Sequence, residues 1–243
     1  LSSALASFLD YLEAGRNASA HTLAAYRRDL LQFARRHWGR DARPPYAWQE
    51  VDRYAARRFL ALMQKEGRSA TTVRRKLSCL RSFYRFLMRR SILEHNPFAG
   101  LPLMKAARPL PAVLTVAEVT RLLRAPLRGA SAAKDAFSEY RPLRDAAILE
   151  ILYSSGMRLN ELVQMNDRDI DLLSGTVKVR GKGKKERLCP LGRPALEALR
   201  RSMECRDRLA AVAEAARDPH PVFVNRDGGR LTGRSIERMM KRC

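Results

Sequence analysis

The first hundred residues alternate between apolar and polar positions with the period of an α-helix. Turn-forming segments, such as 14–17 and 43–45, separate the periodic stretches. The pattern predicts four amphipathic helices, at about 2–14, 19–37, 50–65 and 69–90. Because no strand pattern competes in this part of the chain, we expect a small helical bundle.

The helix at 69–90 has the clearest pattern. Behind a Ser69 cap, its apolar stripe consists of Val73, Leu77, Leu80, Tyr84 and Leu87. Beside that stripe lies a flank of arginines: Arg74, Arg81, Arg85 and Arg89, with Arg75 just beyond. Most charged helix faces are simply solvated. Such faces usually carry both acidic and basic side chains, whereas this helix contains no acidic residue. The pattern therefore favours a surface that contacts phosphates.

The helix at 19–37 is similar. Its expected buried stripe is Leu23, Tyr26, Leu30, Phe33 and Ala34, and its expected outer side chains are Arg27, Arg28, Gln32, Arg35 and Arg36. We place Asp29 among these outer residues, which makes this face less purely basic. Two basic helices of a size that fits the major groove of DNA thus belong to one bundle.

Prolines between 99 and 113 exclude a continuous helix there. We interpret this segment as a linker between a helical domain at 1–98 and a second domain at 114–243. The second domain opens on a capping box at 115–118, followed by a short helix to about Leu123. We expect a loop at 126–142, an apolar helix at 143–154 and, after the turn at Ser155 and Gly156, a further helix from Met157.

Residues 168–190 change to alternating apolar and polar positions, which predicts a small antiparallel sheet with a tight turn at 181–184. A helix at 194–216, a short strand at 222–224, a turn at 227–229 and a helix from Thr232 complete the second domain. The expected fold is mainly α-helical with a small antiparallel β-sheet.

Charge narrows the class of protein. The 243 residues contain 47 Lys and Arg against 25 Asp and Glu, a net charge of +22. Residues 1–113 hold 21 basic and 8 acidic side chains, and residues 114–243 hold 26 and 17. Because both halves share the excess, a basic tail on a neutral protein is excluded, and nucleic acid is the expected partner.

The four cysteines show no C-x-x-C spacing, and the four histidines are scattered. This argues against a zinc site and a disulfide framework, and fits a reducing cytoplasm. No apolar stretch reaches the ~20 residues that span a bilayer. We expect a cytoplasmic protein that uses no metal and no cofactor.

Two motifs suggest a chemistry. Residues 153–163, with the sequence YSSGMRLNELV, are followed by GKGKKER at 181–187 and PLG at 190–192. They resemble the first two catalytic motifs of the Xer branch of the tyrosine recombinase (phage integrase) family. Residues 19–30 and the Asn-Pro at 96–97 resemble the same branch. The resemblance covers nearly the whole chain and implies a SAM-like core-binding domain of four helices, followed by a catalytic domain.

The first motif offers Arg158, whose planar guanidinium suits two non-bridging oxygens of a reacting phosphate. Glu161, one turn later, could orient it. The alternative is an ordinary ion pair on a helix surface, which stabilises a helix by only ~0.2–0.5 kcal/mol. In the second motif, Lys182 matches the family's catalytic lysine and would act as general acid, whereas the alternative is a solvated turn. Lys184, Lys185 and Arg187 would neutralise phosphates. A nucleotide-binding P-loop is excluded, because Gly183 follows Lys182.

The resemblance places the family's third box, His-x-x-Arg, its later His and its nucleophilic Tyr beyond Cys243. Tyr153 is the last tyrosine and precedes Arg158. We interpret Tyr26 and Tyr84 as core residues and Tyr153 as packing beneath the Arg158 turn, and we assign no nucleophile. Since the chain also starts at Leu1, we expect a fragment that binds DNA without cleaving it.

For the full-length protein the resemblance implies site-specific recombination through a 3′-phosphotyrosyl intermediate. It also implies other recombinase subunits as partners, in a XerC/XerD-type heterotetramer on DNA, and a role in chromosome dimer resolution, partition and cell division. The alternatives are a mobile-element integrase, a catalytically inactive DNA-binding or architectural protein and a type IB topoisomerase. A transcriptional regulator is the least favoured, because it leaves Arg158 and Lys182 unexplained.

Overall fold

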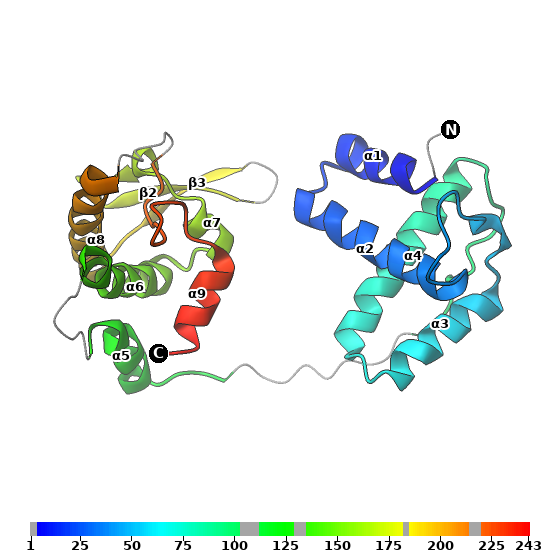
Figure 1. Ribbon diagram of the computed structural model, residues 1–243, viewed down its shortest axis with the longest axis horizontal. Coiled ribbons are helices and arrows are strands. Elements are labelled where there is room, and N and C mark those ends of the chain that lie inside the picture. Colours follow the sequence, from blue (N-terminus) through cyan, green and yellow to red (C-terminus); the bar gives the residue numbers. More distant parts are fainter. Residues whose placement is uncertain (1–3, 103–111, 129–134, 182–184, 214–219) are drawn as a thin grey trace. The chain divides into compact units, whose positions relative to one another are not determined.

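The computed structural model describes residues 4–102, 112–128, 135–181, 185–213 and 220–243, with only the backbone for 210–213. The chain divides into two compact units, Leu1–Leu110 and Pro111–Cys243. Each unit is considered by itself (Figure 1). The domain boundaries of 1–98 and 114–243 stay a prediction, and residues 103–111 of the predicted linker lie outside the described residues.

The first unit is a helical bundle. Its elements are α1 (Ala4–Arg16), α2 (Ala20–His37), the 3-10 turn η1 (Trp48–Glu50), α3 (Arg53–Lys65) and α4 (Ala70–Arg89). All four helices were expected, with ends within about three residues of those observed. Local caps explain where three of them start: Ser19, Asp52 and Ser69 each accept a hydrogen bond from a backbone N–H of the first turn.

Aromatic side chains fill the core of this unit. The ring of Phe33 lies 5.0 Å from that of Phe59 and 5.4 Å from that of Phe98, both edge to face. The five apolar residues of the α4 stripe are fully buried, as their spacing predicted. Among them, Tyr84 donates its hydroxyl hydrogen to the carbonyl oxygen of Trp48 at 3.2 Å, and burial raises the pKa of this phenol.

Asp29 of α2 corrects the expectation that it lies on the outer face, because it is only 2% exposed. Its carboxylate accepts bonds from both terminal nitrogens of Arg75 on α4, and from Nζ of Lys76 at 2.7 Å. Lys76, itself buried, also donates to Gln32. The attraction of the two cations offsets the free-energy cost of removing this carboxylate from water. Because the cations belong to α4 and the carboxylate to α2, these pairs also tie the two helices together.

The second unit combines helices with a three-stranded sheet. Its helices are α5 (Val116–Arg124), α6 (Ala136–Ser155), α7 (Leu159–Val163), α8 (Arg193–Ala213) and α9 (Gly233–Met240), with 3-10 turns η2 (Ala125–Leu127) and η3 (Asp167–Asp169). The strands β1 (Ile170–Asp171), β2 (Thr176–Arg180) and β3 (Glu186–Pro190) form an antiparallel sheet in the order β1-β2-β3. This confirms the mainly α-helical fold with a small antiparallel sheet.

One side of the sheet closes the core of the second unit. Val177, Val179 and Cys189 point into a cluster with Ile148 of α6 and Leu199 of α8, and all five are buried. α6 and α8 lie side by side beneath the sheet (Figure 1). None of the described helices is both long and apolar enough to cross a membrane.

The loop expected at 126–142 is wrong over its second half, because α6 already starts at Ala136. Asp135 and Ser138 form a capping box, each accepting a hydrogen bond from the other's backbone N–H. Pro142 lies inside the helix, where it removes one backbone bond, and the fully buried Tyr140 anchors this first part of α6 in the core. Residues 129–134 lie outside the described residues.

The strand expected at 222–224 is also wrong. Among the described residues, the segment makes one isolated bridge, between Val224 and Arg230, and the preceding Pro221 makes another with Asn166. Its apolar residues are buried in the core. The apolar run therefore indicated burial rather than a β-strand. A strand needs a partner strand that pairs with it along its length. The expected turn at 227–229 and the final helix are confirmed, the latter capped by Thr232.

Replacing Asp29 should destabilise the first unit. Asp29→Asn leaves Lys76 buried without a counter-charge, and breaking a buried pair in this way costs about 3 kcal/mol of unfolding free energy. Urea unfolding followed by tryptophan fluorescence reports on this unit alone, because both tryptophans, Trp38 and Trp48, belong to it.

Glu66→Gln is the matched control, because Glu66 pairs at the surface with Arg36 and Arg68. It should cost less than about 1 kcal/mol. Equal losses of unfolding free energy in the two variants would show that the Asp29 network does not hold α2 to α4.

Candidate functional site

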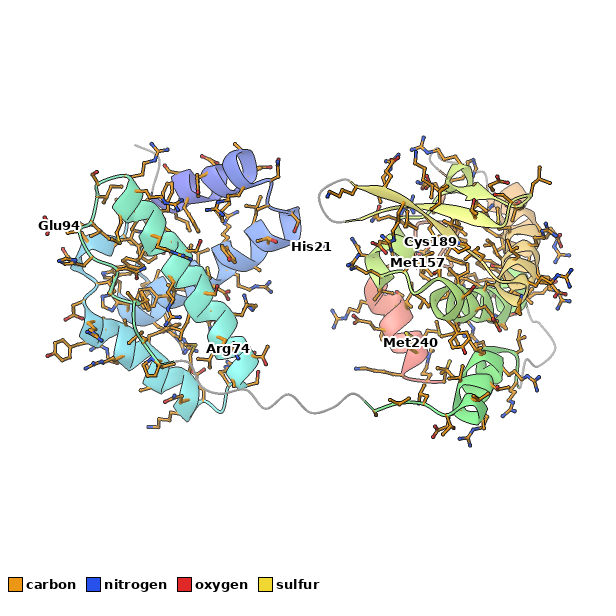
Figure 2. All side chains as sticks on the ribbon, turned by 180° about the vertical axis from the view of Figure 1, so that it is seen from behind. His21, Arg74, Glu94, Met157, Cys189 and Met240 are labelled. Carbon is orange, nitrogen blue, oxygen red and sulfur yellow. The ribbon has the colours of Figure 1, made fainter. Side chains whose placement is uncertain are left out.

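A tight turn presents Arg158 at the end of α6. Gly156 ends the helix with a φ of 60°, a left-handed conformation that glycine adopts without strain. Met157 then buries its side chain in the core (Figure 2). Arg158 follows as the N-cap of α7, and its side chain is 74% exposed. The backbone of Arg158 is therefore anchored while its guanidinium faces outward.

The carboxylate of Glu161 holds this arginine in place. Glu161 is the third residue of α7, and its Oε2 accepts the backbone N–H of Arg158 at 2.8 Å, as in a capping box. Its Oε1 accepts a bond from Nη1 of the Arg158 guanidinium at 3.0 Å. The side chain of Glu161 is only 5% exposed. A single buried carboxylate thus fixes both the backbone and the side chain of Arg158.

Arg187 of β3 completes this cluster from the other side. Its Nη1 and Nη2 donate to Oε1 and Oε2 of Glu161 at 2.8 and 2.7 Å, the parallel two-bond geometry of strong arginine–carboxylate pairs. These bonds are the main reason that the pKa of Glu161 is lowered from 4.5 to about 2, against the opposing effect of burial. The same pair raises the pKa of Arg187. One carboxylate and two guanidinium groups leave the cluster with a net charge of +1.

The hairpin of β2 and β3 carries the second motif. Arg187 stands opposite Val179, and beyond this pair the N–H of Gly181 donates to the carbonyl oxygen of Lys185 at 2.7 Å. A Cβ atom on Gly181 would lie 3.4 Å from Nη1 of Arg187 and 3.6 Å from Oε1 of Glu161. The hairpin backbone therefore passes next to the carboxylate. Lys182 and Lys184, which the sequence predicted to act here, lie outside the described residues.

Basic side chains also line grooves on the first unit. One groove, of about 760 Å³, runs along α4 and the segment 96–100; its arginines are Arg74, Arg75, Arg81 and Arg85. Arg74 is exposed on the surface of α4 (Figure 2). Arg81 donates to the carbonyl oxygens of Phe98 and Leu101 at 2.9 and 2.6 Å, so its guanidinium is fixed rather than free. Arg89, expected on the same flank, donates instead to the hydroxyl of Tyr11 at 2.9 Å.

The predicted basic residues of α2 line a second groove, of about 1280 Å³, between α1 and α2. They are Arg27, Arg28 and Arg35, and Arg36 lines it as well. A third groove, of about 390 Å³, has both Arg28 and Arg75 on its wall, with the buried Asp29 beneath them. The structure thus brings the basic faces of α2 and α4 together.

Tyr153 does not pack beneath the Arg158 turn as expected, because it is 66% exposed. It lies on the solvent side of α6, whereas Ile151 on the opposite side is fully buried. Sequence reasoning also missed Lys76, although its place at the edge of the apolar stripe of α4 is a signal for a buried charge. Among the described residues, no three His, Cys, Asp or Glu side chains are grouped to hold a metal ion.

Comparison with known proteins finds a family match for each unit. Residues 112–243 match the phage integrase family, and residues 5–91 match the phage integrase N-terminal SAM-like domain. The tyrosine recombinase XerC of Syntrophus aciditrophicus (strain SB) is 38% identical over 238 residues, which cover 96% of this chain and 74% of that protein.

Two solved structures are similar in fold. The Tn1549 transposon integrase in complex with circular intermediate DNA has a TM-score of 0.67 at 18% identity, over 99% of this chain and 78% of that one. A lambda integrase dimer bound to a core site has a TM-score of 0.65 at 18% identity, over 100% and 76%. At this level of identity, the likeness shows the fold alone.

The low pKa of Glu161 predicts a pH-dependent contribution to stability. Because the folded pKa is about 2 and the ordinary value is 4.5, ionised Glu161 stabilises the folded unit above pH 4.5. This contribution is lost as the pH falls toward 2. The difference in unfolding free energy between wild type and Glu161→Gln should therefore shrink between about pH 6 and pH 3.

Urea titrations that follow pulse-labelled hydrogen exchange in peptides from β2 and β3 measure this difference within the second unit. Glu197→Gln is the control, because Glu197 makes an exposed pair with Arg201 on α8. A pH-independent difference between wild type and Glu161→Gln would mean that Glu161 is not held as an ion by its two arginines.

Proposed function

The chain belongs to the phage integrase family, and from that premise we propose that it serves site-specific DNA recombination as a tyrosine recombinase. Such an enzyme cuts and rejoins DNA strands through a 3′-phosphotyrosyl intermediate. The observation that carries the proposal is the Arg158–Glu161–Arg187 cluster, in which an exposed guanidinium is held by a buried, ionised carboxylate.

Arg158 binds the scissile phosphate in this proposal. Transfer of a phosphoryl group to an enzyme hydroxyl builds negative charge on the non-bridging oxygens. A guanidinium fixed before the reaction stabilises this charge without having to reorganise. Arg158 meets the requirement because its Nη1 is held by Glu161 while the rest of its guanidinium is open to solvent. Glu161 supports catalysis by orienting Arg158.

Lys182 is proposed as the general acid that protonates the 5′-oxygen leaving group. The support is its place in the second motif, one residue after Gly181, whose backbone lies beside the Arg158 cluster. The attacking tyrosine and the family's later His and Arg have no assigned match in residues 1–243.

The first unit is proposed to bind double-stranded DNA through α2 and α4. A helix fits the major groove, and arginines on its flanks reach the phosphates. The leading candidate contacts on α4 are Arg74 and Arg85, and those on α2 are Arg27, Arg28 and Arg35. Arg75 and Arg81 line the same α4 groove and add positive charge there, although Asp29 and two backbone carbonyl oxygens hold their guanidinium groups. Burial of Asp29 removes an acid from the exposed surface and so leaves it more uniformly basic. Lys184 and Lys185 of the hairpin are further candidates.

The proposed partners are DNA and other recombinase subunits. A lambda integrase of the same fold is bound to its core site as a dimer, which supports an oligomer on DNA. We propose chromosome dimer resolution rather than integration of mobile DNA, with the similarity to a XerC recombinase as its support, and a XerC/XerD-type heterotetramer as the assembly that acts.

Removing charge from the α4 groove should weaken DNA binding and its salt dependence. For Arg74→Gln combined with Arg85→Gln, the slope of log K against log salt should fall by about 0.9 for each phosphate that is no longer neutralised. Fluorescence anisotropy with a random-sequence duplex, at a series of salt concentrations, measures the slope. Arg57→Gln removes one charge from α3, outside the groove, and should leave the salt slope unchanged. If the double variant in the α4 groove also left the slope unchanged, the proposed role of the groove in DNA binding would be contradicted.

Loss of Arg158 should abolish strand cleavage. A binding sequence is first selected from a random duplex library and then built into a nicked suicide substrate, which traps the covalent adduct with the full-length protein. Arg158→Ala should reduce adduct formation at least ~100-fold, because it removes the main stabiliser of the phosphoryl charge.

Arg168→Ala, which removes an exposed arginine of η3, should leave adduct formation unchanged. If the wild-type protein binds the selected site but forms no adduct, the protein is a DNA-binding or architectural protein instead. If Arg158→Ala forms adduct at the wild-type rate, the proposed role of Arg158 is wrong.

A further inference from the structure

We propose that Arg187 is a positioning residue that keeps Arg158 oriented for phosphoryl transfer and keeps the cluster net positive, rather than a side chain that binds DNA. The inference rests on the proposed recombinase function and deepens it. It starts from the observation that one buried carboxylate serves two arginines that are 29 positions apart in the sequence and belong to different elements.

The hydrogen bonds of Glu161 are complete only with Arg187. An ionised carboxylate has about four lone-pair sites. Glu161 fills them with two bonds from Arg158, at 2.8 and 3.0 Å, and two from Arg187, at 2.8 and 2.7 Å. Without Arg187, each oxygen of a side chain that is 5% exposed would keep one bond. The carboxylate would then have half of its hydrogen bonds and would hold the Arg158 guanidinium less firmly.

Charge balance gives the second reason. A pair of Arg158 and Glu161 alone is neutral, so the carboxylate would cancel much of the attraction of Arg158 for a phosphate. Arg187 supplies a second positive charge to the same carboxylate, and the cluster of three keeps a net charge of +1. Its two short bonds are the largest cause of the lowered pKa of Glu161, so Arg187 does most to keep this acid ionised.

The position of Arg187 also limits a direct role in binding DNA. Both of its terminal nitrogens are committed to Glu161, and its side chain is 41% exposed, against 74% for Arg158. Arg158 uses only one terminal nitrogen for Glu161. The guanidinium that is more open to a phosphate is therefore that of Arg158, whereas that of Arg187, on β3, is held by Glu161.

The test separates a positioning residue from a DNA-binding one in the full-length protein. Arg187→Gln should slow adduct formation on the nicked substrate about 10- to 100-fold, as expected for the loss of a group that orients a catalytic side chain. The salt slope of DNA binding should stay at the wild-type value, whereas removal of a side chain that neutralises a phosphate would lower it by about 0.9. Arg187→Lys keeps the positive charge but cannot make two parallel bonds to the carboxylate, so it should recover part of the rate of adduct formation.

Arg180→Gln is the matched control. Arg180 lies on β2 of the same hairpin and pairs with Glu186 at 3.0 Å, so the variant removes an equal charge without touching Glu161. It should cleave at the wild-type rate. A wild-type rate for Arg187→Gln, or a lower salt slope with normal cleavage of bound DNA, would overturn the inference. Absence of adduct in the wild-type protein would instead overturn the proposed recombinase function.

Discussion

The site depends on how the carboxylate of Glu161 is shared. A buried acid beside a single arginine would form a neutral pair and leave no charge for a phosphate. Here the acid lies between two arginines, whose side chains are 74% and 41% exposed, and all of its lone-pair sites are used. The arrangement is rigid because α7 supplies Glu161 and Arg158 while β3 supplies Arg187. The cluster thus gains orientation from its ion pairs without losing its positive charge.

The same arrangement occurs in the first unit, where Asp29 lies between Arg75 and Lys76. In a chain with a net charge of +22, cationic side chains repel one another wherever they gather. A buried acid shared by two of them lowers this repulsion locally and still leaves one positive charge over. At Asp29 the result is a pair of helices, α2 and α4, joined beneath their basic faces. At Glu161 it is a single oriented guanidinium.

Much of the fold follows from periodicity and caps, which are local properties of the sequence. The four helices of the first unit, the capping box of α5 and the small sheet were all predicted in this way. The errors arose where tertiary structure overrides local preference. Asp29 was placed outside because charges usually are, and Tyr153 inside because aromatic rings usually are. The polar, small residues of 126–142 were taken for a loop, although a cap at Asp135 starts α6 within this segment. The pairing of Arg187 with Glu161 spans 26 positions and two elements, so no local pattern could reveal it.

The ionisation of Glu161 can be measured directly. In protein labelled with ¹³C at glutamate side chains, the carboxyl resonance of Glu161 can be assigned by its loss in Glu161→Gln and followed as the pH is lowered. If two arginines share this carboxylate, its titration midpoint lies near a pKa of about 2, and the resonance stays at its ionised position while exposed glutamates titrate. A midpoint close to 4.5, together with those exposed residues, would contradict the account.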